Sequence, residues 1–115
     1  MGYYTTYILE VDMDTVDLDQ KLSLEEDIKS ISNYYPFHRY KIGYTLETEP
    51  IKWYSHNTDM LKLSSKHPLV EFILEGYGEE RDDVWRKYYR KGKVKKILPQ
   101  IIWPNRDEIE KMEWT

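Results

Sequence analysis

The chain has 115 residues, no cysteine and a formal net charge of −4 at pH 7. This length suits a single domain with one core over residues 1–115, and the absence of cysteine excludes disulfides, thiolate zinc sites and cysteine nucleophiles. No segment has the apolar length of a membrane span or the pattern of a signal peptide, so we expect a cytoplasmic protein without a membrane partner.

The first third of the chain predicts a strand followed by a helix. Residues 3–11 alternate with a two-residue period, which is typical of a strand, and the acidic run 12–19 ends it. Ser23 and Glu26 have the spacing of a capping box, so we expect a helix that begins at Ser23. This helix should stop before Pro36, because a residue that precedes proline is disfavoured in the helical region.

The middle of the chain predicts two more strands, a helix and a central strand. Residues 38–48 alternate again, and residues 51–54 predict a brief strand with its apolar side chains inward. Residues 55–66 read as a second helix. Residues 69–74 are the most apolar strand pattern and are therefore expected at the centre of the sheet.

The last third predicts a hairpin and a short helix. Residues 76–78, Gly-Tyr-Gly, are expected in a polar loop. Residues 83–90 and 93–103 are expected to form a hairpin that turns at Lys91–Gly92. Asn105 can cap a short terminal helix.

This order of elements predicts an α+β fold. The series β-α-β-β-α-β matches a ferredoxin-like split βαβ sheet with two helices on one face, extended by the C-terminal hairpin and the terminal helix. The other face of the sheet should be open and should carry Tyr4, Thr6 and Ile8. Such a face can bind a partner, or it can be covered by the hairpin or by a second copy of the chain.

The basic and aromatic segment 85–96 is the strongest indication of a partner. Residues 81–98 carry a net charge of +6, so the rest of the chain carries −10. Cations at this density attract phosphates, and the aromatic residues of the segment could stack on bases. Strand alternation, however, divides the segment between two faces. One face takes Arg86, Tyr88 and Arg90, and the other takes Trp85, Lys87 and Tyr89.

A purely structural interpretation of this segment stays open. Trp85 would then be a core anchor, and the lysines would protect an edge strand from aggregation. The acidic first 35 residues, which carry −6, could neutralise the positive charge within the protein.

The acidic segments are weaker candidates. The run Asp12–Asp19 does not have the spacing of a calcium loop. The cluster Glu75–Asp83 could hold Mg²⁺ for phosphoryl transfer, but no histidine pair or phosphate-cradling glycine motif accompanies it. We therefore expect no catalytic residues, no metal and no cofactor, and we keep a metal-dependent phosphoryl-transfer enzyme at this Gly/Glu loop as a second alternative.

One further pattern covers about residues 50–95. It consists of a Lys-Trp-Tyr strand at 52–54, an Asp-Met pair at 59–60, a Gly/Glu loop at 75–80 and the sequence Asp83-Val84-Trp85-Arg86-Lys87-Tyr88 with Gly92-Lys93. This pattern resembles small uncharacterised accessory proteins of tailed phages and prophages. It contains no catalytic motif. It implies a phage-borne protein that binds and inhibits host machinery, of the anti-CRISPR kind.

Together these observations favour a small non-enzymatic interaction protein, an inhibitor or modulator of a host defence protein or nucleoprotein complex. The first alternative is a nucleic-acid or nucleotide-binding module that uses the basic hairpin. The exposed tyrosines and the edge strand leave a homodimer open. The residues expected to bind the partner are Arg86, Arg90, Lys93, Lys95, Asp14, Asp17, Glu79 and Glu80.

Overall fold

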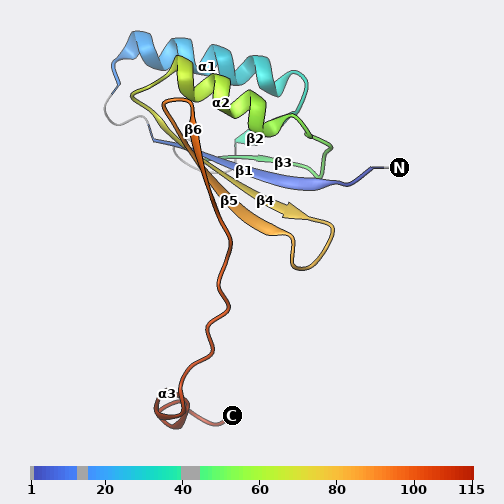
Figure 1. Cartoon of the computed structure of the whole chain (residues 1–115), viewed down its shortest axis with the longest axis vertical. Helices are drawn as coiled ribbons and strands as arrows, with labels where there is room; N and C mark the ends of the chain where they lie inside the picture. Colours follow the sequence, from blue (N-terminus) through green and yellow to red (C-terminus); the bar gives the residue numbers. More distant parts are fainter. Residues whose placement is uncertain (1, 13–15, 40–44) are drawn as a thin grey trace.

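The computed structural model describes residues 2–12, 16–39 and 45–115, which form a mixed α+β fold (Figure 1). Six strands make one sheet in the order β2-β3-β1-β4-β5-β6, and every neighbouring pair is antiparallel. The strands are β1 (Thr5–Asp12), β2 (Phe37–Arg39), β3 (Thr45–Thr48), β4 (Glu71–Gly78), β5 (Val84–Arg90) and β6 (Lys93–Ile97). The helices are α1 (Leu18–Ser32), α2 (His56–Lys66) and α3 (Arg106–Glu110).

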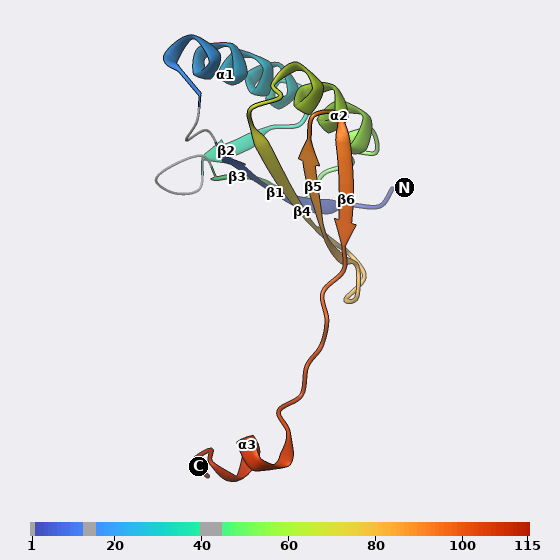
Figure 2. The same cartoon turned by 60° about the vertical axis from the view of Figure 1, so that its left-hand side comes forward.

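The expected α+β class is confirmed. Helices α1 and α2 lie on the same side of the sheet in both views, so the opposite side has no helix over it (Figures 1 and 2). The order β-α-β-β-α-β is present from β1 to β4, and the hairpin β5–β6 extends the sheet. Assignment to the ferredoxin-like group stays a prediction.

Strand β1 shows how the sequence separates the two sides. Its odd-numbered residues, such as Tyr7 and Leu9, are buried beneath the helices, whereas Glu10 and Asp12 are exposed on the other side. This is the alternation that residues 3–11 predict. We call the side of the sheet that carries Thr6, Ile8 and Glu10 the open face.

Helix α1 begins earlier than we expected. Its N-cap is Asp17, whose Oδ1 accepts a hydrogen bond of 2.9 Å from the amide of Gln20, and the Gln20 side chain accepts one from the amide of Asp17. The expected start at Ser23 is therefore wrong, because Asp17 and Gln20 form the capping box. Part of the acidic run thus belongs to the helix and its cap.

Two strand predictions need correction. The single strand expected over 38–48 is two strands, since β2 and β3 pair antiparallel with each other; residues 40–44 of that prediction lie outside the described residues. The strand expected at 51–54 is reduced to one bridge between Ile51 and Thr5. Trp53 nevertheless points inward as expected and is fully buried.

The centre of the sheet consists of β1 and β4, as the apolar pattern of 69–74 predicts. The expected loop at Gly76–Gly78 is wrong, because these residues complete β4 and pair with Thr5–Tyr7 of β1. Gly76 lies opposite Trp85 of β5, and a side chain at position 76 would collide with the indole ring. Glycine is therefore required here by close packing rather than by an unusual backbone angle.

The hairpin turns at Lys91–Gly92, as expected, with φ of 52° and 73°. Two successive positive angles give the tight turn that suits the twist of a hairpin, and glycine accepts such an angle without strain. The amide of Gly92 donates a 3.0 Å hydrogen bond to Ser64 Oγ of α2. This bond holds the tip of the hairpin against the helix. The second strand ends at Ile97, so its expected extension to residue 103 is wrong.

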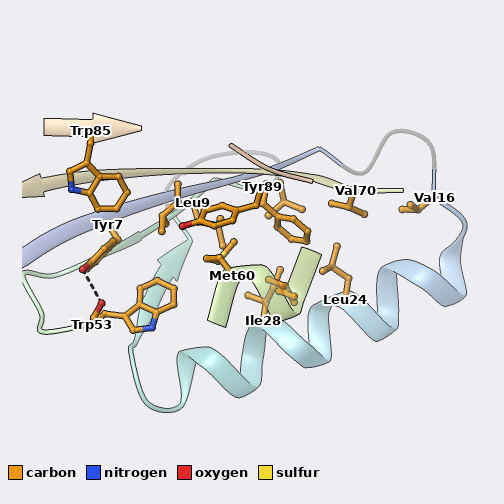
Figure 3. Packing of buried hydrophobic residues seen from close by; sticks show 14 residues of the cluster. Tyr7, Leu9, Val16, Leu24, Ile28, Trp53, Met60, Val70, Trp85 and Tyr89 are labelled. Atoms are coloured by element: carbon orange, nitrogen blue, oxygen red, sulfur yellow. Dashed lines mark hydrogen bonds between the residues drawn. The ribbon is translucent and has the colours of Figure 1, made fainter. Parts of the chain in front are cut away.

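The core lies between the sheet and the two helices (Figure 3). Trp53 is at one end of it, with its ring centroid 5.1 Å from that of Tyr7 and 5.2 Å from that of Tyr35. The Tyr7 hydroxyl donates to the Trp53 carbonyl oxygen at 3.1 Å, drawn as a dashed line in Figure 3. Trp85 also belongs to this core, which confirms its expected role as an anchor.

A polar cluster joins the two helices. Asp27 of α1 lies 3.0 Å from Lys66 Nζ and 2.6 Å from His67 Nε2, at the end of α2. Burial alone raises the pKa of Asp27, but the hydrogen bonds from His67 and Lys66 outweigh burial and hold this pKa below its usual value. The ionised carboxylate therefore stabilises the helix pair.

Residues 98–115 form an extension that we call the C-terminal arm. It leaves the end of β6 and runs away from the sheet to α3, as both views show (Figures 1 and 2). Asn105 caps α3, as expected, by accepting a 2.9 Å hydrogen bond from the Glu108 amide. The arm makes the molecule elongated: its radius of gyration is 17.3 Å, compared with about 13 Å for a compact chain of this length.

Candidate functional site

The open face of the sheet is divided into an acidic and a basic half. Strand register aligns Glu10 of β1 with Ile73 of β4, Tyr88 of β5 and Lys95 of β6. A second row aligns Ile8 with Glu75, Arg86 and Ile97. The acidic side chains on this face thus come from β1, β3 and β4, namely Glu10, Asp12, Glu47, Glu71 and Glu75, and the basic ones from β5 and β6, namely Arg86, Arg90, Lys93 and Lys95.

Ion pairs join the two halves where β4 meets β5. Arg86 Nε lies 2.8 Å from Glu75 Oε1, and Arg90 Nη1 lies 3.7 Å from Glu71 Oε2. Hydrogen bonding to Tyr88 and Glu75 raises the pKa of Arg86 above its ordinary value. Arg86 is therefore held in place by hydrogen bonds, and part of the charge of both arginines is neutralised within the protein.

A hollow of about 670 Å³ lies at the turn end of the basic half. We call it the basic hollow; it is lined by Glu71, Tyr88, Arg90, Lys91, Lys93, Val94 and Lys95. Lys93 and Lys95 are exposed, and neither forms an ion pair with any residue that the structure describes. With four cations and one carboxylate, this site attracts anionic groups.

The structure brings together the four basic residues that we expected to bind a partner. Arg90, Lys93 and Lys95 line the basic hollow, and Arg86 lies beside it in the next row of the open face. Arg86, Tyr88 and Arg90 share this face, as strand alternation predicts, while Trp85 and Tyr89 are buried on the helix side.

The three acidic candidates that the structure describes do not form one surface. Asp17 is the N-cap of α1, which follows the end of β1. Glu79 and Glu80 are exposed in the turn after β4, beside the beginning of β1, because Gly78 pairs with Thr5. Asp14 lies outside the described residues. The acidic set is thus distributed between opposite ends of β1.

Glu71, Lys91 and Val94 of the hollow were not anticipated as binding residues, and Glu75 was considered only as part of a possible magnesium cluster. Glu71 and Glu75 of β4 form ion pairs to the hairpin. The sequence does hold a signal for the two glutamates, since Glu71 and Glu75 alternate with buried Phe72 and Leu74. Their partners on β5, however, depend on a register that one sequence does not specify.

On the helix side, the same hairpin contributes to a closed aromatic and basic cluster. Lys87 Nζ lies 3.0 Å from His56 Nε2, and His56 stacks on Trp85 with ring centroids 5.0 Å apart. Burial, and then the charge of Lys87, lowers the pKa of His56. Burial also lowers the pKa of Lys87. A neutral His56 can donate from Nδ1 to the Trp53 carbonyl oxygen at 3.0 Å and accept from Lys87 at Nε2. This cluster packs against the core through Trp85 and His56.

Other kinds of site find little support in the geometry. Within residues 2–12, 16–39 and 45–115, no group of three or more metal-ligating side chains is close enough to hold an ion. No helix in these ranges is long and apolar enough to cross a membrane. The chemistry that the open face supports is the binding of anions by the positive charges of its basic half.

Comparison with known proteins gives no family for this chain. No protein-family model matches it, and no curated protein or solved structure is significantly similar to it. The resemblance to phage accessory proteins therefore stays a prediction.

Proposed function

We propose that this protein acts by binding an acidic surface of a partner protein at its basic hollow, without catalysing a reaction. The observation that carries this proposal is the gathering of Arg90, Lys93 and Lys95 around one hollow on an uncovered sheet face. Cations concentrated in this way speed up association with an acidic partner and select against basic ones. The resemblance to phage accessory proteins adds that the partner is a host defence protein or nucleoprotein complex, which the protein inhibits or modulates.

A protein partner fits this face better than a nucleic acid does. Binding to single strands uses several aromatic rings as stacking platforms, but Trp85 and Tyr89 are buried in the core. Of the three aromatic residues in the hairpin, only Tyr88 lines the basic hollow. The acidic half of the same face would repel a phosphate backbone that extended beyond the hollow.

The proposal can be tested by capture from a bacterial lysate with the immobilised full chain, before and after nuclease treatment. We then compare the affinity of the captured partner for two variants with equal charge change. Lys93→Glu with Lys95→Glu alters the basic hollow, and Lys21→Glu with Lys62→Glu alters the two helices on the other side of the sheet.

We expect the hollow variant to lose at least tenfold in affinity, about 1.4 kcal/mol, and the helix variant to bind nearly as the natural chain does. Equal effects of the two variants would contradict a site at the basic hollow. Loss of capture after nuclease treatment would instead identify nucleic acid as the ligand.

A further inference from the structure

The C-terminal arm exposes apolar side chains that the fold leaves uncovered. Ile101, Ile102, Trp103 and Trp114 are each more than four-fifths exposed, at 83%, 81%, 84% and 85%. None of the buried core residues comes from the arm. A row of large apolar side chains on an elongated extension is typical of a protein-binding segment rather than of a solvated terminus.

The tip of the arm is acidic as well as apolar. Residues 105–115 contain Asp107, Glu108, Glu110 and Glu113 against two basic residues, a net charge of −2. Arg106 is paired with Glu110 at 3.2 Å. Asp107, Glu108 and Glu113 form no ion pair in the part of the chain that the structure describes. The tip therefore complements a cavity that is basic and partly apolar.

The basic hollow has this character, with its cations placed beside Tyr88 and Val94. It is the opposite of the arm tip in charge, and both belong to the same chain. Within one copy, however, they lie apart. The hollow is at the turn end of β6 near Lys91, whereas the arm starts at the other end of β6, after Ile97, and runs away from the sheet (Figures 1 and 2).

A second copy removes this separation. Consider two copies that lie antiparallel about a two-fold axis, offset so that each arm runs along the β6 edge of the other copy. The tip of each arm then lies at the turn of the other β6, beside its basic hollow. An extended segment such as 98–105 spans about 26 Å at 3.3 Å per residue, which is long enough to pass the five residues of β6. The same operation carries the second arm to the first hollow, so the assembly closes as a dimer.

We infer that the C-terminal arm of one copy docks in the basic hollow of a second copy, and that the two copies exchange arms. Apolar residues such as Trp103 and Met112 are then covered, and Asp107 and Glu108 lie close to Lys93 and Lys95. The inference rests on the proposed function in one respect, because it places the arm at the same hollow. An acidic partner would have to displace the arm, so the dimer would be a closed form of the binding site.

Zero-length cross-linking provides the direct test. Equal amounts of ¹⁴N-labelled and ¹⁵N-labelled full chain are mixed and treated with a carbodiimide, which joins carboxylates to neighbouring lysines. We expect cross-links from Asp107, Glu108 or Glu113 to Lys93 or Lys95, with mixed isotopic composition. If every such cross-link joined two peptides with the same isotope, the arm would fold back on its own copy. That outcome would overturn the inference.

Sedimentation velocity over a concentration series tests the charge pairing. Asp107→Lys with Glu108→Lys should weaken the dimer at least tenfold, and adding Lys93→Glu with Lys95→Glu to the same chain should restore it. This restoration separates charge pairing from any loss of α3, which the restoring changes do not touch. The control is Glu79→Lys with Asp82→Lys, an equal charge change in the exposed turn after β4, which should leave the dimer intact.

A natural chain that stays monomeric throughout the series would overturn the inference. The proposed function is judged separately. A dimer that forms as expected, with partner capture unaffected by Lys93→Glu and Lys95→Glu, would contradict only the proposed function. A monomer whose capture of a partner is lost in that variant would contradict only the arm exchange.

Discussion

Neighbouring tyrosines on β5 have opposite surroundings on the two sides of the sheet. Tyr89 is fully buried on the helix side, and its hydroxyl donates to Asn57 Oδ1 at 2.9 Å. Tyr88 lies on the open face, where its hydroxyl accepts from Arg86 at 3.3 Å and its ring lines the basic hollow. One strand thus supplies core packing on one side and charged surface on the other. The comparison suggests that stability and partner binding can be changed independently in this protein.

The largest expected effect is the loss of the buried tyrosine. Tyr89→Ala should lower the free energy of unfolding by about 3–5 kcal/mol, because it removes a large core side chain and leaves a cavity. Tyr88→Ala is the matched control and should cost less than about 1 kcal/mol. Denaturant unfolding measures both changes. Equal losses would mean that the open face is covered and packed in solution.

A smaller effect is expected at Gly76, where β4 lies against Trp85 of β5. Gly76→Ala places a methyl group against the Trp85 ring, and overpacking of this kind costs about 1–3 kcal/mol. Tyr77→Ala, at the next position of β4 but on the open face, should cost less. Thermal unfolding of the two variants gives the comparison, and a harmless Gly76→Ala would contradict the close packing of β4 on Trp85.

The hydrogen bonds between α1 and the end of α2 are expected to have the next largest effect on stability. Asp27→Asn weakens charge-assisted hydrogen bonds to His67 and Lys66, and we expect a loss of about 1–2 kcal/mol. The pKa of Asp27 is lowered on folding, so its contribution is complete above its ordinary value of 3.8 and disappears as the pH falls below it. Acid unfolding followed by circular dichroism should show that the stability of the variant depends less steeply on pH. Identical acid profiles would rule out this contribution.

The smallest expected effect comes from His56, on the helix side of the hairpin. Its pKa is lowered on folding, so the unfolded chain binds its proton more readily, and stability should fall as the pH drops below about 6.5. We expect a loss of at most about 1 kcal/mol between roughly pH 7 and 5.5. His56→Phe keeps an aromatic ring beside Trp85 and should remove this loss of stability at lower pH. Denaturant unfolding at the two pH values measures the change in the free energy of unfolding. The same change in the variant and in the natural chain would contradict a contribution from His56.

Much of the fold could be predicted from local patterns. Alternation in residues 3–11 identifies β1 and its buried side, and Lys91–Gly92 identifies the hairpin turn. Asn105 identifies the start of α3. Each of these signals is carried by residues within a few positions of one another, so one sequence is sufficient to read them.

Features that depend on distant residues could not be predicted in this way. The start of α1 is an exception, because the capping box of Asp17 and Gln20 is local and could have been read beside that of Ser23 and Glu26. Gly76 resembles a loop glycine until Trp85 is placed against it. The pairing of Glu75 with Arg86 follows from the β4–β5 register. For the same reason, the basic half of the candidate site was found from composition, whereas its acidic neighbours on β4 were not.

The position of β1 has a consequence for folding during synthesis. This strand is made before β3 and β4, yet it lies between them in the sheet. Its hydrogen bonds to β4 join residues 5–12 to residues 71–78, so this edge of β1 cannot be paired until most of the chain has been made. Contacts of such sequence separation slow folding, and an unpaired central strand invites association with other nascent chains. The open edge of β1 should therefore be the most association-prone part of the sheet until β4 pairs with it.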